Sequence, residues 1–261
     1  MRLRDLTDDL ARSIAFLSRF PVPERHFVGF DGRLVRAARA FPAAGLMIAL
    51  PAAALLSLMD AFNADATLSA LLAIGLLAIV TGALHEDGLA DVADGLGATH
   101  DREKALTIMK DSRIGTFGGL ALILNIGIRT AALAALIPSL SPSGMGLTVL
   151  AVAALSRTAM VWHWQSLPPA RRDGVAASAG VPDADATRLA LVSGLGAGLV
   201  LLAIAGAGLL PTLVSLALSA AFLVLFGRSI ESRLGGHTGD TIGAAQQITE
   251  MALLAALALS V

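Results

Sequence analysis

Residues 41–59 have the sequence FPAAGLMIALPAAALLSLM, which contains no charged side chain. A helix needs about 20 largely apolar residues to cross a bilayer, so this stretch predicts a transmembrane helix. Six more stretches of this kind follow it, and we expect an all-α, polytopic membrane bundle forming a single domain over residues 1–261. The seven expected spans are residues 41–59, 67–84, 116–137, 147–165, 187–208, 212–227 and 243–261.

The composition of the whole chain agrees with that prediction. Hydrophobic residues make up 56% of the 261 positions, against about 45–50% in a soluble domain. Charged residues make up 15%, against about 25%. The chain has no cysteine, which excludes disulfides, thiolate metal ligands and a cysteine nucleophile. An ordinary soluble domain is therefore not expected.

The segment before the first span has a different pattern. Apolar residues recur at helical spacing between charged ones over residues 5–20, and PVP at 21–23 ends the pattern. This pattern predicts an amphipathic helix at the membrane interface, within a cytoplasmic or interfacial segment covering residues 1–40. The apolar positions are Leu6, Leu10, Ile14, Leu17 and Phe20.

Lysine and arginine mark one side of the predicted bundle. They occur before the first span and in 85–115, 166–186 and 228–242, whereas 60–66, 138–146 and 209–211 contain none. Positive residues favour the cytoplasmic side. We therefore expect a multi-pass protein of the bacterial cytoplasmic (inner) membrane, with a cytoplasmic N-terminus and Val261 outside. The polar segments, including 85–115, would then form an active site on the cytoplasmic side.

The segment richest in carboxylates is HEDGLADVADGLG, residues 85–97. Asp87, Asp91 and Asp94 would fall within about 60° of arc on a helix, whereas Glu86 would point away. Three like charges on one face repel unless a cation lies among them, and hard oxygen ligands suit Mg²⁺ or Mn²⁺. These three aspartates are therefore predicted metal ligands; the alternative is a solvated acidic face at a helix end.

A second polar stretch, MKDSRIGTFGG, covers residues 109–119. It adds Asp111 as a fourth candidate metal ligand between Lys110 and Arg113, both candidate phosphate contacts. Asp111 is also the first candidate for the catalytic base, because its neighbouring cations should keep it ionised; His85 is the second. The alternative for this stretch is a basic boundary that snorkels to the interface.

Two further groups of polar residues are candidate substrate contacts. The segment RLGGHTGDTIGAA, residues 233–245, presents His237, Thr238, Gly239 and Asp240 among glycines, which favours a phosphate or nucleotide contact over a flexible loop. It is not a P-loop, because it lacks the GK[ST] ending. Buried charges are expensive in a membrane and usually face the bundle interior, so two arginines inside apolar spans are expected to contact substrate there or to serve in pairing and packing. They are Arg129 and Arg157.

These residues together indicate metal-assisted phosphate chemistry at the membrane face. Residues 91–98, DVADGLGA, are similar to the first half of the motif of CDP-alcohol phosphotransferases, but Thr99 stands where that family has arginine and the second half is missing. A transporter that binds a cation through the aspartates is the non-enzymatic alternative, although transporters place such groups nearer the bilayer midplane.

The chain resembles the cobalamin synthase family, the adenosylcobinamide-GDP ribazoletransferases, over nearly its whole length. The resemblance lies in FLSRFPVP (16–23), FPAAG (41–45), GALHEDGLADVADGLG (82–97), REKALTIMKDSRIGTFGGLAL (102–122), SR (156–157) and LGGHTGDTIGA (234–244).

That resemblance implies a reaction that the residues alone do not specify. It implies that α-ribazole, or its 5′-phosphate, attacks adenosylcobinamide-GDP, that Mg²⁺ assists, and that GMP leaves as adenosylcobalamin or its phosphate forms. Arg129 or Arg157 would then contact the diphosphate or the corrinoid arm. Membrane lipid is an expected partner and nucleic acid is not, while the oligomeric state, a homo-oligomer included, is left open.

Overall fold

The computed structural model describes residues 3–260, so the expected location of Val261 lies outside the described residues. The described chain is helical, with one isolated β-bridge between Pro169 and His237. The elements are α1 (Leu3–Leu17), η1 (Glu24–Phe27), η2 (Ala37–Ala40), α2 (Phe41–Ala61), α3 (Ala66–Thr81), α4 (Leu84–Ala98), α5 (Arg102–Ile108), α6 (Thr116–Leu136), η3 (Ile137–Ser139), α7 (Pro142–Ser166), α8 (Val175–Ala179), α9 (Ala184–Ala205), α10 (Leu209–Leu234) and α11 (Gly239–Ala258).

Each expected span corresponds to a helix, but not every helix is a simple span. Within the described residues, five helical segments are long and apolar enough to cross a membrane: 37–61, 116–139, 142–166, 184–205 and 209–234. The pair α3 and α4 adds a sixth if it is counted as one broken span. The helix at the seventh expected span, α11, begins before that span and is less apolar, because it carries Asp240, Gln246, Gln247 and Glu250. The expected count of seven is therefore approximate.

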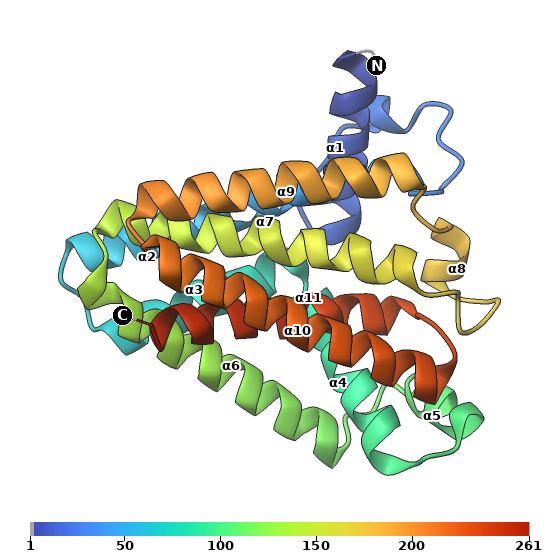
Figure 1. Ribbon diagram of the computed structural model, residues 1–261. Coiled ribbons are helices and arrows are strands. Elements are labelled where there is room, and N and C mark those ends of the chain that lie inside the picture. The colour runs from blue at the N-terminus through green and yellow to red at the C-terminus, as the bar shows by residue number, and fades with distance from the viewer. Residues whose placement is uncertain (1–2, 261) are drawn as a thin grey trace.

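The long helices run side by side, with α11 at the centre of the bundle (Figure 1). This helix packs against α4, α6, α7 and α10, so its polar side chains are shielded from lipid. Large apolar side chains on the outer helices are exposed in the protein alone, including Ile123 on α6, Val192 and Ile204 on α9, and Phe222 and Leu225 on α10. A bilayer would cover this apolar surface.

The N-terminal helix α1 runs nearly perpendicular to the long helices and projects above α9 in the view of Figure 1. Its apolar face is buried against the protein, where Ile14 and Leu17 join a cluster with Phe41 and Trp164. The helix is amphipathic, as expected, but part of its apolar face packs on the bundle. On its polar side, buried Asp9 forms an ion pair with Arg39 at 2.6 Å.

We call the end of the bundle that carries α4, α5, α8 and the start of α11 the polar end; it is on the right in Figure 1. The helix α4 reaches this end through a sharp bend of 92° from α3. Gly82 and Ala83 have φ values of +65° and +58° at the bend, a left-handed conformation that glycine adopts readily and alanine rarely does. A Cβ on Gly82 would also lie 2.2 Å from Arg19 Nε. The bend therefore depends on glycine at position 82.

Candidate functional site

Three aspartates from two helices lie together at the polar end, outside the five long spans. Asp87 and Asp91 stand one turn apart on α4, and Asp240 lies at the start of α11. The two helices approach closely at Gly88, where a Cβ would lie only 2.7 Å from the Asp240 carbonyl oxygen. Glycine at 88 therefore allows the Asp240 backbone to approach the α4 aspartates.

These carboxylates perturb one another because they share a partly buried region. Burial and the charges of Asp87, Asp240 and Asp94 raise the pKa of Asp91 to about 7, against a smaller opposing effect of Arg171. Burial also raises the pKa of Asp240, although Arg171 and the Thr238 hydroxyl act in the opposite direction. A group of carboxylates that is hard to ionise without a counter-charge is a suitable environment for a cation.

Asp94 also lies on α4 but is engaged with α6. Its two carboxylate oxygens accept hydrogen bonds from the backbone N–H groups of Gly115, at 2.7 Å, and Gly118, at 2.8 Å. A Cβ on either glycine would lie within 2.4 Å of an Asp94 oxygen. The glycines after Asp111 therefore let Asp94 hold the first N–H groups of α6, which would otherwise lack partners.

The segment around Asp111 is exposed, and its charges are paired in an unexpected way. Arg113 donates to Asp111 at 2.6 Å, and this interaction lowers the pKa of Asp111 to about 2. Lys110 pairs instead with Asp173, which lies in the loop after α7, at 2.6 Å. An aspartate with so low a pKa remains ionised but accepts a proton poorly, which favours a ligand role over that of a base.

The glycine-rich loop before α11 is fixed to the loop after α7. The His237 N–H donates to the Pro168 carbonyl at 2.8 Å, and the Ala170 N–H donates to the His237 carbonyl at 2.9 Å. Gly236 packs so closely here that a Cβ would lie 2.0 Å from the Pro168 oxygen. Thr238 then begins α11 with a capping box, and Arg171 pairs with Asp240 at 3.3 Å.

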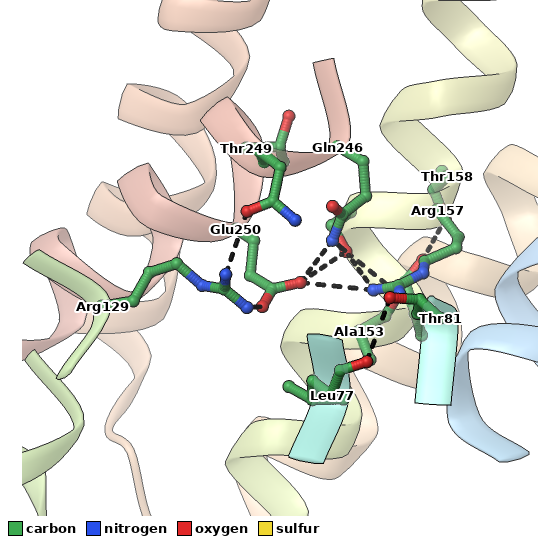
Figure 2. Close-up of polar contacts among 12 residues, drawn as sticks. Leu77, Thr81, Arg129, Ala153, Arg157, Thr158, Gln246, Thr249 and Glu250 are labelled. Atoms are coloured by element: carbon green, nitrogen blue, oxygen red, sulfur yellow. Dashed lines mark hydrogen bonds and ion pairs between the residues drawn. The ribbon is translucent and has the colours of Figure 1, made fainter. Parts of the chain in front are cut away.

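The two intramembrane arginines do face the bundle interior, where one carboxylate lies between them (Figure 2). Glu250 on α11 pairs with Arg129 and also with Arg157, the latter at 3.2 Å. Gln246 donates to the same carboxylate. Arg129 also donates to the Gln247 side-chain oxygen at 2.9 Å. The arrangement matches the pairing role considered for these arginines, and leaves their predicted contact with substrate as a prediction.

This interior network reaches α4 at the residue before Asp87. Glu86 is buried, accepts a hydrogen bond from Gln247 at 2.9 Å, and lies 3.5 Å from Arg129. Neighbouring His85 is also buried, and its Nε2 has no hydrogen-bond partner within the described residues. His85 is thus enclosed within the protein, away from the exposed face of Asp87.

The predicted site residues therefore fall into three groups, apart from Asp94, which is bound to the start of α6. Asp87, Asp91, His237, Thr238, Gly239 and Asp240 lie around the contact of α4 with the start of α11. Lys110, Asp111 and Arg113 lie on an exposed neighbouring segment. His85, Arg129 and Arg157 lie in the interior.

Arg171 and Glu250 were not predicted as site residues from the sequence. The signal for Arg171 was a basic pair in a polar loop, and Glu250 is the only acidic residue in the seventh expected span.

In the described part of the chain, no three histidine, aspartate or glutamate side chains are arranged to hold a metal ion. The chemistry of the donors nevertheless fits a divalent cation. Asp87, Asp91 and Asp240 offer only hard oxygen ligands, as Mg²⁺ and Mn²⁺ prefer. The raised pKa of Asp91 reflects its burial and, after that, the negative charges of the neighbouring carboxylates. These three are the residues best placed to hold such an ion.

Comparisons with known proteins agree over almost the whole chain. Residues 9–258 match the family of cobalamin-5-phosphate synthases. An adenosylcobinamide-GDP ribazoletransferase of Sinorhizobium medicae is 58% identical over 259 residues, with 99% of each chain covered. The proteins of the same name from Rhizobium meliloti and Brucella anthropi are 57% and 42% identical, covering 99% and 100% of each chain. No solved structure matches significantly.

Proposed function

Because the chain belongs to the cobalamin-5-phosphate synthase family, we propose that it joins adenosylcobinamide-GDP to α-ribazole 5′-phosphate or α-ribazole and releases GMP. The family relationship carries the identity of the substrates. The observation that connects it to particular residues is the meeting of Asp87, Asp91, Asp240 and Arg171 at the polar end. Carboxylates for a cation beside an arginine for a phosphate are the parts that transfer from a diphosphate requires.

The reaction replaces a phosphoanhydride bond at phosphorus by an ester bond. The ribazole hydroxyl oxygen forms a bond to the phosphorus attached to the cobinamide arm, and the bond from that phosphorus to the oxygen bridging to GMP breaks. The hydroxyl proton passes to a base, and GMP takes the electron pair of the broken bond. The protein must hold the two substrates in line and balance the charge that develops on the phosphate oxygens.

We propose Mg²⁺, with Mn²⁺ as a substitute, as the ion that Asp87, Asp91 and Asp240 would hold. When bound, such an ion neutralises phosphate oxygens and the leaving group. Asp94 would contribute by fixing the start of α6 beside this face, through its hydrogen bonds to Gly115 and Gly118. Lys110 and Arg113, on the exposed segment, would attract the anionic substrates.

The membrane location also follows from charge and hydropathy. The five long apolar helices indicate a multi-pass membrane protein, and the polar end carries the arginine-containing loops. We propose that this end faces the cytoplasm of a bacterium, where nucleotide-activated substrates are available. The apolar helices would be embedded in the cytoplasmic membrane.

The proposed function can be tested by measuring GMP release from GDP-cobinamide with purified, detergent-solubilised protein, with and without Mg²⁺, and with each ribazole as acceptor. We expect Asp91→Asn to lower turnover at least about a hundredfold, the effect typical of a lost electrostatic partner. Asp185→Asn is the matched control, because Asp185 is exposed on α9 and pairs only loosely, at 3.6 Å, with Arg188.

Two results would contradict the proposal. Full activity of Asp91→Asn at ordinary Mg²⁺ concentrations would refute the proposed metal site. Release of CMP from CDP-activated donors, with no reaction of GDP-cobinamide, would instead assign the chain a different phosphotransferase activity.

A further inference from the structure

A small polar pocket lies between the loop after α7 and the start of α11. Arg171, His237, Thr238 and Gly239 are among the residues that line it. Asp240, which follows directly in the chain, belongs to the carboxylate group described above. The pocket therefore adjoins the proposed cation site.

His237 supplies polar atoms that lack protein partners. Its side chain is 1% exposed, and neither ring nitrogen makes a hydrogen bond within the described residues. Burial lowers its pKa to about 4, so the ring is neutral near pH 7, with one nitrogen to donate and one to accept. Buried polar atoms are normally paired, so this ring indicates a missing ligand or solvent partner.

The start of α11 contributes hydrogen-bond donors to the same place. The Thr238 hydroxyl accepts from the Thr241 N–H at 3.2 Å, and the Ile242 N–H donates to the Thr238 carbonyl. The N–H groups of Gly239 and Asp240 come first in the helix, and such groups have no intrahelical acceptor. The start of a helix of 20 residues also favours negative charge through its dipole.

Arg171 completes the arrangement, because only one of its two terminal guanidinium nitrogens has a partner. Its Nη2 pairs with Asp240 at 3.3 Å, whereas its buried Nη1 has no hydrogen-bond partner among the described residues. A guanidinium suits phosphate because its parallel donors can bind two oxygens at once.

We infer that this pocket binds a phosphate group of the substrates, held by Arg171, His237 and the first N–H groups of α11. This inference rests on the proposed function and assigns Arg171 a role in it. Two phosphates share the required chemistry: the phosphate of the guanylate leaving group and the 5′-phosphate of the ribazole acceptor. Because Asp240 lies between the pocket and the α4 aspartates, a phosphate bound here would lie next to the cation.

The test compares Arg171→Gln with Arg172→Gln, which removes the same charge from the exposed neighbouring residue. GMP and α-ribazole 5′-phosphate are titrated separately into the detergent-solubilised full chain, and binding heat is measured. Losing a charge-assisted hydrogen bond should weaken binding of the relevant phosphate by about tenfold or more, and Arg172→Gln should bind as the unchanged protein does. Arg171→Lys should lie between, because it keeps the charge but loses the fork.

The two ligands distinguish the source of the phosphate. Weaker binding of GMP alone assigns the leaving group, and weaker binding of the acceptor phosphate alone, with a matching rise in its KM relative to α-ribazole, assigns the acceptor. Unchanged binding of both ligands to Arg171→Gln, or an equal loss in Arg172→Gln, would overturn the inference. If Arg171→Gln does not fold, the same criteria apply to Arg171→Lys. If the protein binds GMP but does not release GMP from GDP-cobinamide, the proposed function is refuted, whereas the inference that the pocket binds phosphate is retained.

Discussion

Replacing Glu250 by Gln is the most direct test of the interior network. The carboxylate of Glu250 is buried and lies between two buried arginines (Figure 2). Arg129 has a second acidic neighbour, Glu86, at 3.5 Å, whereas the ion pair of Arg157 is with Glu250. The substitution keeps the size of the side chain and removes the charge, so Arg157 becomes the cation without a counter-charge.

The magnitude follows from the balance of charges. Arg129 and Arg157 are matched by Glu86 and Glu250, so the network is neutral as a whole. Glu250→Gln leaves one buried positive charge uncompensated. Removing one partner of a buried pair typically costs about 3–5 kcal/mol, and we expect the free energy of unfolding to fall by that amount. A second substitution, Arg157→Gln, should restore neutrality and recover about half of the loss or more.

The assay is reversible unfolding in mixed micelles by added SDS, applied to both single variants and the double variant. Each single variant should be less stable than the double variant, because each leaves an unmatched charge. An ordinary surface substitution changes the free energy of unfolding by about 0.5 kcal/mol or less. If the free energy of unfolding of Glu250→Gln differs from that of the unchanged protein by no more than this, then charge balance does not stabilise this network.

The remaining predictions concern the polar end. The pKa of Asp91 is raised to about 7, so a proton competes with Mg²⁺ below that pH; affinity for Mg²⁺ should rise by up to about tenfold per unit from pH 6 to 7 and level off above pH 8. This pH dependence, followed by calorimetric titration, should be absent in Asp91→Asn. Gly118→Ala would place a Cβ 2.3 Å from a carboxylate oxygen of Asp94, which accepts hydrogen bonds from the first N–H groups of α6. This substitution should lower the free energy of unfolding by about 1–2 kcal/mol, as for a lost helix cap. Gly119→Ala, where nothing lies within 4 Å, is its control in a thermal melt. Reporter enzymes fused near Asp101 should report the cytoplasm and those near Asn63 the periplasm, and a cytoplasmic signal at Asn63 would reverse the orientation.

The parts of the fold that depend on local sequence were predictable. Hydropathy over about 20 residues locates a span, and the positions of all seven expected spans contain helices. The interior location of Arg129 and Arg157 was also predictable, because lipid does not solvate a charge. The break between α3 and α4 was not predicted, since an apolar run does not reveal that Ala83 adopts a left-handed conformation.

The carboxylate group shows where helical spacing alone is insufficient. Spacing correctly placed Asp87, Asp91 and Asp94 on one helix, but the neighbours change along that helix. Near Gly88 the closest backbone belongs to α11, whereas Asp94 meets the start of α6. Asp240 and Arg171 join the group from positions far along the chain, and contacts across more than 65 residues leave no periodic signal in one sequence.

The structure also shows how the interior and the polar face are connected. Glu86 and Asp87 are consecutive on α4, and consecutive helical residues point about 100° apart. One carboxylate is therefore directed to Arg129 and Gln247 in the interior, while the other is exposed at the polar end. Since the interior pairing fixes the rotation of α4 about its own axis, it also fixes which face presents the aspartates. The buried charges and the proposed cation site are thus two consequences of one helix orientation, set where the broken span meets α11.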